Sequence, residues 1–216
     1  EDAYRQGRIT GRELKKLGVN MNLAPVLDLY SLPGNPSLGI RSFGSLPQRV
    51  ALLGNALIRG MQEEGIIATA KHFPGKGKAG SDSHKELPVI PNSASDLESH
   101  DLLPFKAAIN RGVKAMMTSH AAYPAFDRKT VLPATVSDKI LTGLLRRELH
   151  FKNLVITDDL GLGAIRNHFF LPAAALKALK AGADLILLCH SPVDQERTFA
   201  VLNRQWGGDS QLARRA

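Results

Sequence analysis

The residues from Lys71 to His84, KHFPGKGKAGSDSH, gather the side chains best suited to chemistry. Within this segment Asp82 and His84 are two positions apart, so that both side chains can point the same way in an extended chain. The carboxylate could then accept a hydrogen bond from one imidazole nitrogen and leave the other nitrogen free to transfer a proton. This spacing predicts a general acid/base pair. The alternative is a solvent-exposed Asp and His in a flexible loop.

The glycines of the same segment allow a different interpretation. Gly75, Gly77 and Gly80 form a literal G-x-G-x-x-G, the dinucleotide-binding fingerprint. That motif requires a helix to open at the glycines, whereas residues 81–88 lead to a proline and have no helical apolar period. We therefore expect no nicotinamide or flavin cofactor.

A metal site is a further alternative for these side chains. His72 could bind a metal ion together with Asp82 and His84. No compact motif such as His-Glu-x-x-His is present, however. We therefore expect no metal ion.

A second acidic pair, Asp158-Asp159, follows the apolar residues 154–157. Adjacent residues on a strand point to opposite faces, so at most one of the two carboxylates should face an active site, and either could instead cap the next helix. A carboxylate nucleophile opposite a proton donor is the arrangement of retaining glycosidases, in which an enzyme ester forms at the anomeric carbon and water releases it. Donors available for sugar hydroxyls are Arg41, Lys71 and His72.

Five short apolar segments predict the strands that position these side chains, and each segment ends in a polar residue. The expected strands are 19–29, 65–73, 113–118, 154–157 and 184–189, with Asp28, Lys71 and His72, His120, Asp158 and His190 at their ends. Between them we expect helices over 2–17, 45–65, 94–111 (interrupted at Pro104), 137–149 and 172–182. In a (β/α)8 barrel the carboxyl ends of all strands meet at one active-site rim, whereas an open doubly wound sheet binds only at its switch point.

The expected fold is therefore α/β, a TIM-type (β/α)8 barrel. Only five β/α units are visible where a closed barrel needs eight strands, and the opening helix has no strand before it. We expect an incomplete barrel that lacks its first strands, with residues 1–216 as a single partial barrel catalytic domain.

Composition excludes several other classes of protein. The 216 residues carry a formal charge of +8, but the basic residues are scattered and no nucleic-acid motif is present, so we expect no nucleic-acid partner. No apolar run approaches the ~18 residues of a membrane span, and no signal-peptide profile opens the chain. The single cysteine, Cys189, excludes an internal disulfide and fits a reducing compartment. A monomer without a membrane partner is expected.

The motif K-H-F-P-G-x-G-x4-D-x-H over residues 71–84 resembles the signature of glycoside hydrolase family 3, in its bacterial exo-β-N-acetylglucosaminidase branch. Three other segments resemble the same family in the same order. These segments are Asn22–Asp28, Asn35–Gly44 and Thr157–Leu160.

The resemblance implies a cytoplasmic barrel enzyme, without metal or organic cofactor, that removes terminal β-linked N-acetylglucosamine, typically from peptidoglycan fragments during cell-wall recycling. By matched position, Asp158 would be the nucleophile, His84 the acid/base and Asp82 its orienting partner. The residues implied to bind the non-reducing sugar are Arg41, Lys71 and His72.

The chain departs from the family in two respects. Lys76 and Lys78 stand where the family usually has His and Asp. The early strands of the family, including an acidic residue that binds the terminal sugar, have no counterpart here.

Two other functions fit parts of the pattern. A glycoside phosphorylase is one, because a neutral imidazole at His84 would not repel an incoming phosphate anion. A catalytically inactive carbohydrate-binding fragment is the other, because the first strands are missing.

Overall fold

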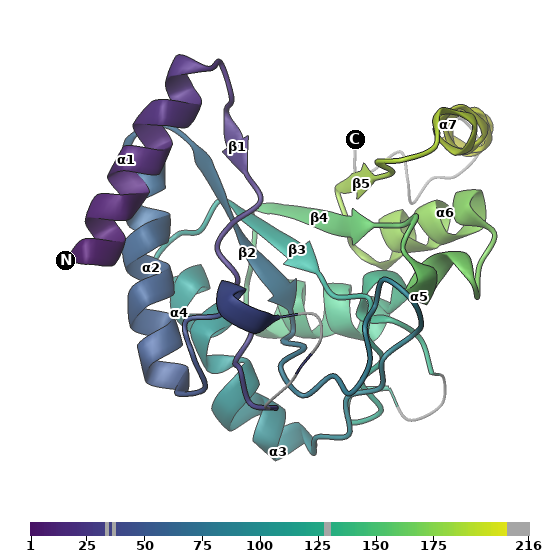
Figure 1. The fold of residues 1–216 in the computed structure, drawn as a ribbon. Helices are drawn as coiled ribbons and strands as arrows, with labels where there is room; N and C mark the ends of the chain where they lie inside the picture. The colour runs from purple at the N-terminus through teal and green to yellow at the C-terminus, as the bar shows by residue number, and fades with distance from the viewer. Residues whose placement is uncertain (33–34, 36–37, 128–130, 207–216) are drawn as a thin grey trace.

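The computed structural model describes residues 1–32, 35, 38–127 and 131–206. Five parallel strands form one sheet in the order β1-β2-β3-β4-β5, so that each strand pairs only with its neighbours in the chain. The sheet curls into part of a barrel (Figure 1), which confirms the expected incomplete α/β barrel. The strands are β1 (Met21–Asn22), β2 (Ile67–Phe73), β3 (Ala115–Thr118), β4 (Leu154–Asp159) and β5 (Leu185–Leu187).

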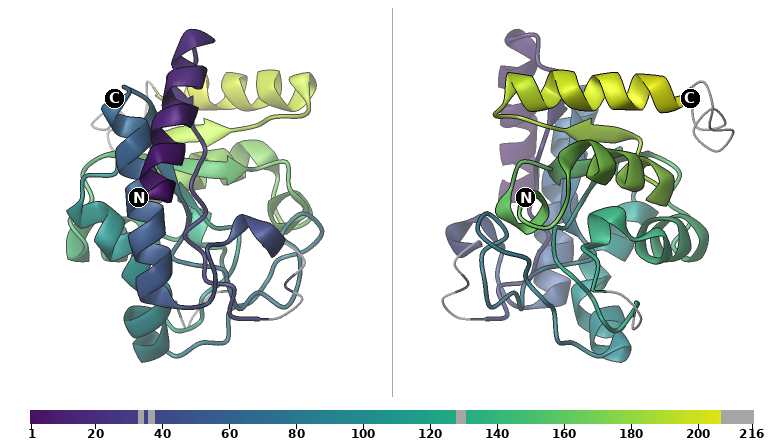
Figure 2. Two further views of the ribbon diagram at one scale, coloured as in Figure 1. Left: turned by 60° about the vertical axis from the view of Figure 1, so that its left-hand side comes forward. Right: turned by 90° about the vertical axis from the view of Figure 1, so that its right-hand side faces the viewer.

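Helices connect the strands, and α2 and α4 both pack against β2. Figure 2 shows the C-terminal helix α7 alongside β5, and α7 also packs on α6. No helix in the described part of the chain is both long and apolar enough to cross a membrane. The α-helices are α1 (Asp2–Lys16), α2 (Pro47–Glu63), α3 (Ala94–Asp96), α4 (Leu103–Asn110), α5 (Gly163–Arg166), α6 (Leu171–Ala181) and α7 (Pro192–Trp206). The 3₁₀-helices are η1 (Gly39–Arg41) and η3 (Ala134–Val136), and the π-helices are η2 (Leu97–Asp101) and η4 (Lys139–Glu148).

The first expected strand is much shorter than predicted. Of residues 19–29 only Met21–Asn22 form a strand, because Pro25 has no N–H to donate to a continuous ladder. The chain nevertheless stays beside β2, since the N–H of Leu27 donates to the Lys71 carbonyl over 2.7 Å. This irregular extended segment delivers Asp28 to the carboxyl end of β2.

Three further expectations needed correction. The last expected strand, 184–189, is a strand only over Leu185–Leu187. The segment expected to be one interrupted helix, 94–111, consists of α3, η2 and α4. Pro104 lies in the first turn of α4, where a backbone N–H would have no partner within the helix, so proline costs no hydrogen bond there. The helix expected over 45–65 is α2, which begins at Pro47 and ends at Glu63.

Close packing fixes the ends of the central strands. Phe73, the last residue of β2, is fully buried, and its ring meets that of Phe105 on α4 edge-on at 5.7 Å between centroids. Large apolar side chains of β3, Met116 and Met117, are buried beside it. The end of β2 that carries Lys71 and His72 is therefore held rigidly by the core.

Candidate active site

Asp28 is the centre of a buried hydrogen-bond cluster at the carboxyl end of β2. Its Oδ2 lies 2.6 Å from Nδ1 of the His72 ring and accepts from the His72 N–H over 3.2 Å, while Oδ1 accepts from the Lys76 N–H over 2.8 Å. Burial alone would raise the pKa of this carboxyl, but His72 and Lys76 together hold it below its usual value. Asp28 therefore stays ionised and fixes the backbone on both sides of Pro74.

His72 lies between two carboxylates. Burial lowers the pKa of its imidazole, so that the ring is neutral near pH 7 and donates its Nδ1–H to Asp28. This leaves Nε2 facing Asp158, whose Oδ2 is 3.8 Å away. His72 thus connects the cluster around Asp28 to the end of β4.

Asp158 and Asp159 have different surroundings at the end of β4. Asp158 keeps 20% of its side chain exposed, whereas the carboxylate of Asp159 is buried and accepts from the N–H groups of Gly161 (2.9 Å) and Cys189 (3.2 Å). Asp159 therefore holds the turn after β4. Burial alone would raise the pKa of Asp158, but nearby His72, His120 and Lys76 hold it below its usual value, so the carboxylate is ionised near pH 7.

Asp82 and His84 form a hydrogen-bonded pair. Asp82 Oδ1 lies 2.7 Å from Nδ1 of the His84 ring and accepts from the His84 N–H over 3.0 Å. Desolvation alone would raise the pKa of the Asp82 carboxyl, but these hydrogen bonds with His84 hold it below its usual value. The ionised carboxylate fixes the ring, and 57% of the His84 side chain remains exposed, so its Nε2 can exchange a proton with a bound molecule.

Backbone hydrogen bonds attach this pair to the turn that follows β4. The Gly163 N–H donates to the carbonyl of His84 and the Ala164 N–H to that of Ser83, each over 3.0 Å. A Cβ atom at Gly163 would lie only 2.4 Å from the carbonyl oxygen of Lys85, so only glycine permits this approach. The Asp82–His84 pair and Asp158 are therefore carried by two directly bonded segments.

This close approach gives a first prediction. Gly163→Ala should displace residues 82–85 and reduce kcat/KM for an aryl glycoside by about 10²-fold, the cost expected for a shift of about 1 Å in a catalytic group. Gly80→Ala is the matched control, because a Cβ atom at Gly80 would meet nothing within 4 Å. Equal losses in the two variants would contradict the inference that the approach at Gly163 positions the loop.

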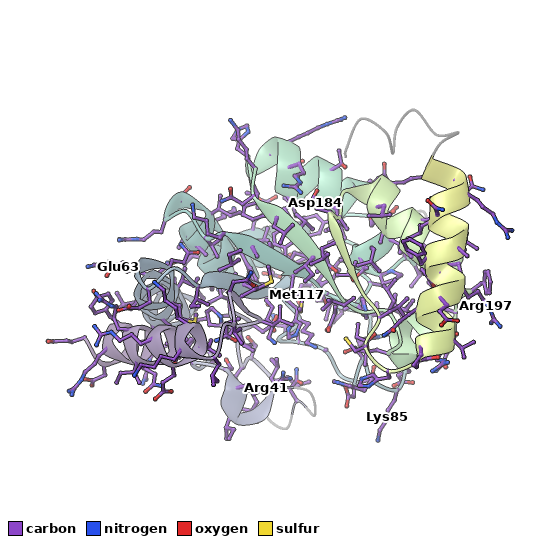
Figure 3. All side chains as sticks on the ribbon, turned by 90° about the horizontal axis from the view of Figure 1, so that it is seen from above. Arg41, Glu63, Lys85, Met117, Asp184 and Arg197 are labelled. Carbon is purple, nitrogen blue, oxygen red and sulfur yellow. The ribbon has the colours of Figure 1, made fainter. Side chains whose placement is uncertain are left out.

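The remaining predicted residues are Lys71, on β2, and Arg41, on η1. Lys71 is partly buried, which lowers the pKa of its ammonium group. The charge of Asp158 opposes this shift, and the charge of Arg41 adds to it. Arg41 is exposed on η1. Figure 3 shows Arg41 and Lys85 extending from one side of the molecule, with Asp184, which precedes β5, on the opposite side.

Several residues at this site were not predicted to have a role. Lys76 is buried, and Asn35 Nδ2 donates to the Gly77 carbonyl over 3.0 Å, which holds the glycine loop. His120 lies buried after β3 and donates from Nε2 to the Asp159 carbonyl over 3.0 Å. Polar residues at strand ends were the signal for His120, but a lysine inside a glycine loop gives no such signal. Among the residues that the structure describes, no three His, Cys, Asp or Glu side chains form a group able to hold a metal ion.

Comparison with known proteins shows the family to which the chain belongs. Residues 1–205 match the N-terminal domain of glycosyl hydrolase family 3. The chain belongs to glycosyl hydrolase family 3. This confirms the resemblance inferred from residues 71–84.

Members of glycosyl hydrolase family 3 resemble the chain over nearly its whole length. The chain is 38% identical over 200 residues to a protein named beta-hexosaminidase from Nitrosomonas eutropha, and the match covers 93% of this chain and 56% of the relative. A family 3 beta-N-acetylglucosaminidase from Paenibacillus superposes with a TM-score of 0.95 at 42% identity, over 99% of this chain and 41% of that one. A beta-N-acetylhexosaminidase from Beutenbergia cavernae gives a TM-score of 0.90 at 30% identity, over 100% of this chain and 65% of that one. The chain thus spans only part of each of these relatives.

Proposed function

We propose that residues 1–216 form the catalytic part of a retaining exo-β-N-acetylglucosaminidase. The observation that carries the proposal is the bonding of the Asp82–His84 loop to the turn after β4, the strand that ends in Asp158 and Asp159. This arrangement joins a low-pKa carboxylate and a proton-transferring imidazole through one set of backbone contacts. A nucleophile and a separate acid/base group are the two parts that retaining glycosidases require.

In the first step Asp158 would attack the anomeric carbon and form a glycosyl ester. His84, protonated and stabilised by the Asp82 carboxylate, would give its Nε2 proton to the departing glycosidic oxygen. In the second step the neutral His84 would take a proton from water. The water oxygen would attack the anomeric carbon and free Asp158, with the original configuration restored.

The sugar would be held by donors on two segments. His72 is fixed by Asp28, and Lys71, whose charge interacts with those of Asp158 and Arg41, would supply a cationic donor together with Arg41. The names of the relatives, beta-hexosaminidase and beta-N-acetylglucosaminidase, support N-acetylglucosamine as the bound sugar. The physiological substrate that we propose is a peptidoglycan fragment recycled in the cytoplasm.

Product analysis tests this proposal. The chain should release β-configured N-acetylglucosamine from 4-nitrophenyl N-acetyl-β-glucosaminide, which proton NMR at early times would detect. The imidazole at His84 keeps a phosphorylase as the second candidate, and formation of N-acetylglucosamine 1-phosphate in phosphate buffer would favour it over hydrolysis. Calorimetric binding of N-acetylglucosamine without turnover would show instead an inactive carbohydrate-binding fragment.

A further inference from the structure

Lys76 is a buried cation inside the glycine loop. It is 2% exposed, and no other lysine is buried in the described part of the chain. Its Nζ, which has three protons to donate, makes one hydrogen bond to the residues that the structure describes, to Ser83 Oγ at 3.5 Å. Among the described residues no carboxylate lies within 4.0 Å of this ammonium group. A buried charge is costly without compensation, so its position needs an explanation.

The main-chain N–H of Lys76 donates to Asp28 Oδ1 over 2.8 Å, which places the residue at the cluster around Asp28. The positive charge of Lys76 contributes to the low pKa of three carboxyl groups from different segments. Asp28 follows β1, Asp82 lies in the loop and Asp158 is the last residue but one of β4. The charge of Lys76 therefore acts on both the proposed nucleophile and the proposed acid/base pair.

His72 and His120 also lower the pKa of Asp158, but they carry no charge near pH 7. Burial lowers the pKa of both His72 and His120, so these imidazoles are neutral. Lys71 remains as a second ammonium group, but it lies on β2 and has no hydrogen bond to the loop among the described contacts. Lys76 is the ammonium group that both acts on Asp158 and contacts the loop.

Ser83 explains how this contact fixes the loop. Its side chain is 1% exposed, whereas 57% of the neighbouring His84 side chain is exposed. Residues 83–85 form a turn, closed by the Lys85 N–H donating to the Asp82 carbonyl over 2.9 Å, and in this turn Ser83 Oγ contacts Lys76 while the His84 side chain is exposed. The Lys76 ammonium thus contacts the loop through the buried side chain of Ser83.

We propose that Lys76 is a positioning residue that serves as the shared counter-charge of the site: it keeps Asp158 anionic and holds the Asp82–His84 loop in place through Ser83. This inference rests on the proposed function, because it assigns Lys76 to the same two-step reaction.

The first test is the pH profile of kcat/KM. Lys76→Met removes the charge, so the pKa of Asp158 should rise and the acidic limb of the profile should move to higher pH. We expect a loss of about 10²-fold at pH 7, similar to the loss of one preorganised donor, and a larger loss at pH 5. Lys76→Arg keeps the charge and should leave the acidic limb in place. Ser83→Ala should raise KM without moving that limb.

Lys78→Met is the matched control, because Lys78 is an exposed lysine of the same loop. It should leave both the acidic limb and kcat/KM unchanged. An acidic limb that stays in place in Lys76→Met, or that moves equally in Lys78→Met, would overturn the proposal. Should Lys76→Met fail to fold, Lys76→Gln provides a second uncharged variant.

A histidine titration by NMR separates this inference from the proposed function. The Lys76 charge helps to lower the pKa of His72, so that pKa should rise in Lys76→Met and stay low in Lys76→Arg, whether or not the chain turns over any substrate. An inactive wild-type chain with this titration behaviour would reject the proposed function and retain the counter-charge. An active wild-type chain whose His72 pKa does not change in Lys76→Met would retain the proposed function and reject the counter-charge.

Discussion

Asp158→Ala should reduce kcat/KM for 4-nitrophenyl N-acetyl-β-glucosaminide by about 10⁴-fold, the scale seen when a catalytic group of an enzyme is deleted. The reason is that no glycosyl ester can form without the carboxylate that lies 3.8 Å from His72 Nε2. Initial rates across a substrate series would measure the loss. Unchanged activity would remove Asp158 from the role of nucleophile.

Asp159→Asn is the matched control for this experiment. The asparagine side-chain oxygen can still accept from the N–H groups of Gly161 and Cys189, so the turn after β4 should persist. We expect a loss of less than about tenfold, because this carboxylate holds the backbone and does not face the His72 ring. A larger loss in Asp159→Asn than in Asp158→Ala would mean that the two carboxylates have exchanged roles.

His84→Ala should show a loss that depends on the leaving group. Substrates with poor leaving groups need protonation of the glycosidic oxygen and should lose about 10²- to 10⁴-fold, the usual contribution of general acid catalysis. Activated aryl substrates should lose much less in the first step, because their leaving groups depart without a proton. Steady-state rates for aryl glycosides of graded leaving-group pKa would measure this dependence.

Two companion variants make the result for His84 specific. Asp82→Asn removes the carboxylate that accepts from the His84 ring and should change the leaving-group dependence in the same direction. His100→Ala, which alters an exposed histidine on η2, should change nothing. If His84→Ala reduced the rate by the same factor for substrates of every leaving group, the result would argue against the acid role of His84.

The fold was largely predictable from the sequence because each β/α unit leaves a local pattern. Short apolar runs bounded by glycines located all five strands, and parallel pairing in chain order placed their polar ends at one rim. The predictions that failed were the lengths of strands, because these lengths depend on pairing with a neighbouring strand. The segment before Asp28 looks like one long strand, but Pro25 divides it, and only contacts with β2 decide where the ladder stops.

The site was predictable only where a motif or a strand end marked it. The Asp82–His84 spacing was visible in the sequence, and the pair is hydrogen-bonded as expected. The burial of Lys76 was not predictable, because lysine is usually exposed and two of the carboxylates on which its charge acts, Asp28 and Asp158, come from distant parts of the chain. The need for glycine at position 163 was equally hidden, since it arises from a carbonyl 78 positions earlier in the chain, that of Lys85.

The contact between residues 83–85 and the start of α5 also affects how far the sequence of this region can change. Main-chain N–H and carbonyl groups make the contacts at Gly163 and Ala164, and these groups are the same for every residue type except proline. Exposed positions of the loop such as Lys78 and Gly80 can therefore accumulate substitutions while the geometry of the site is maintained. Relatives that differ widely along the loop should still share the glycine at 163.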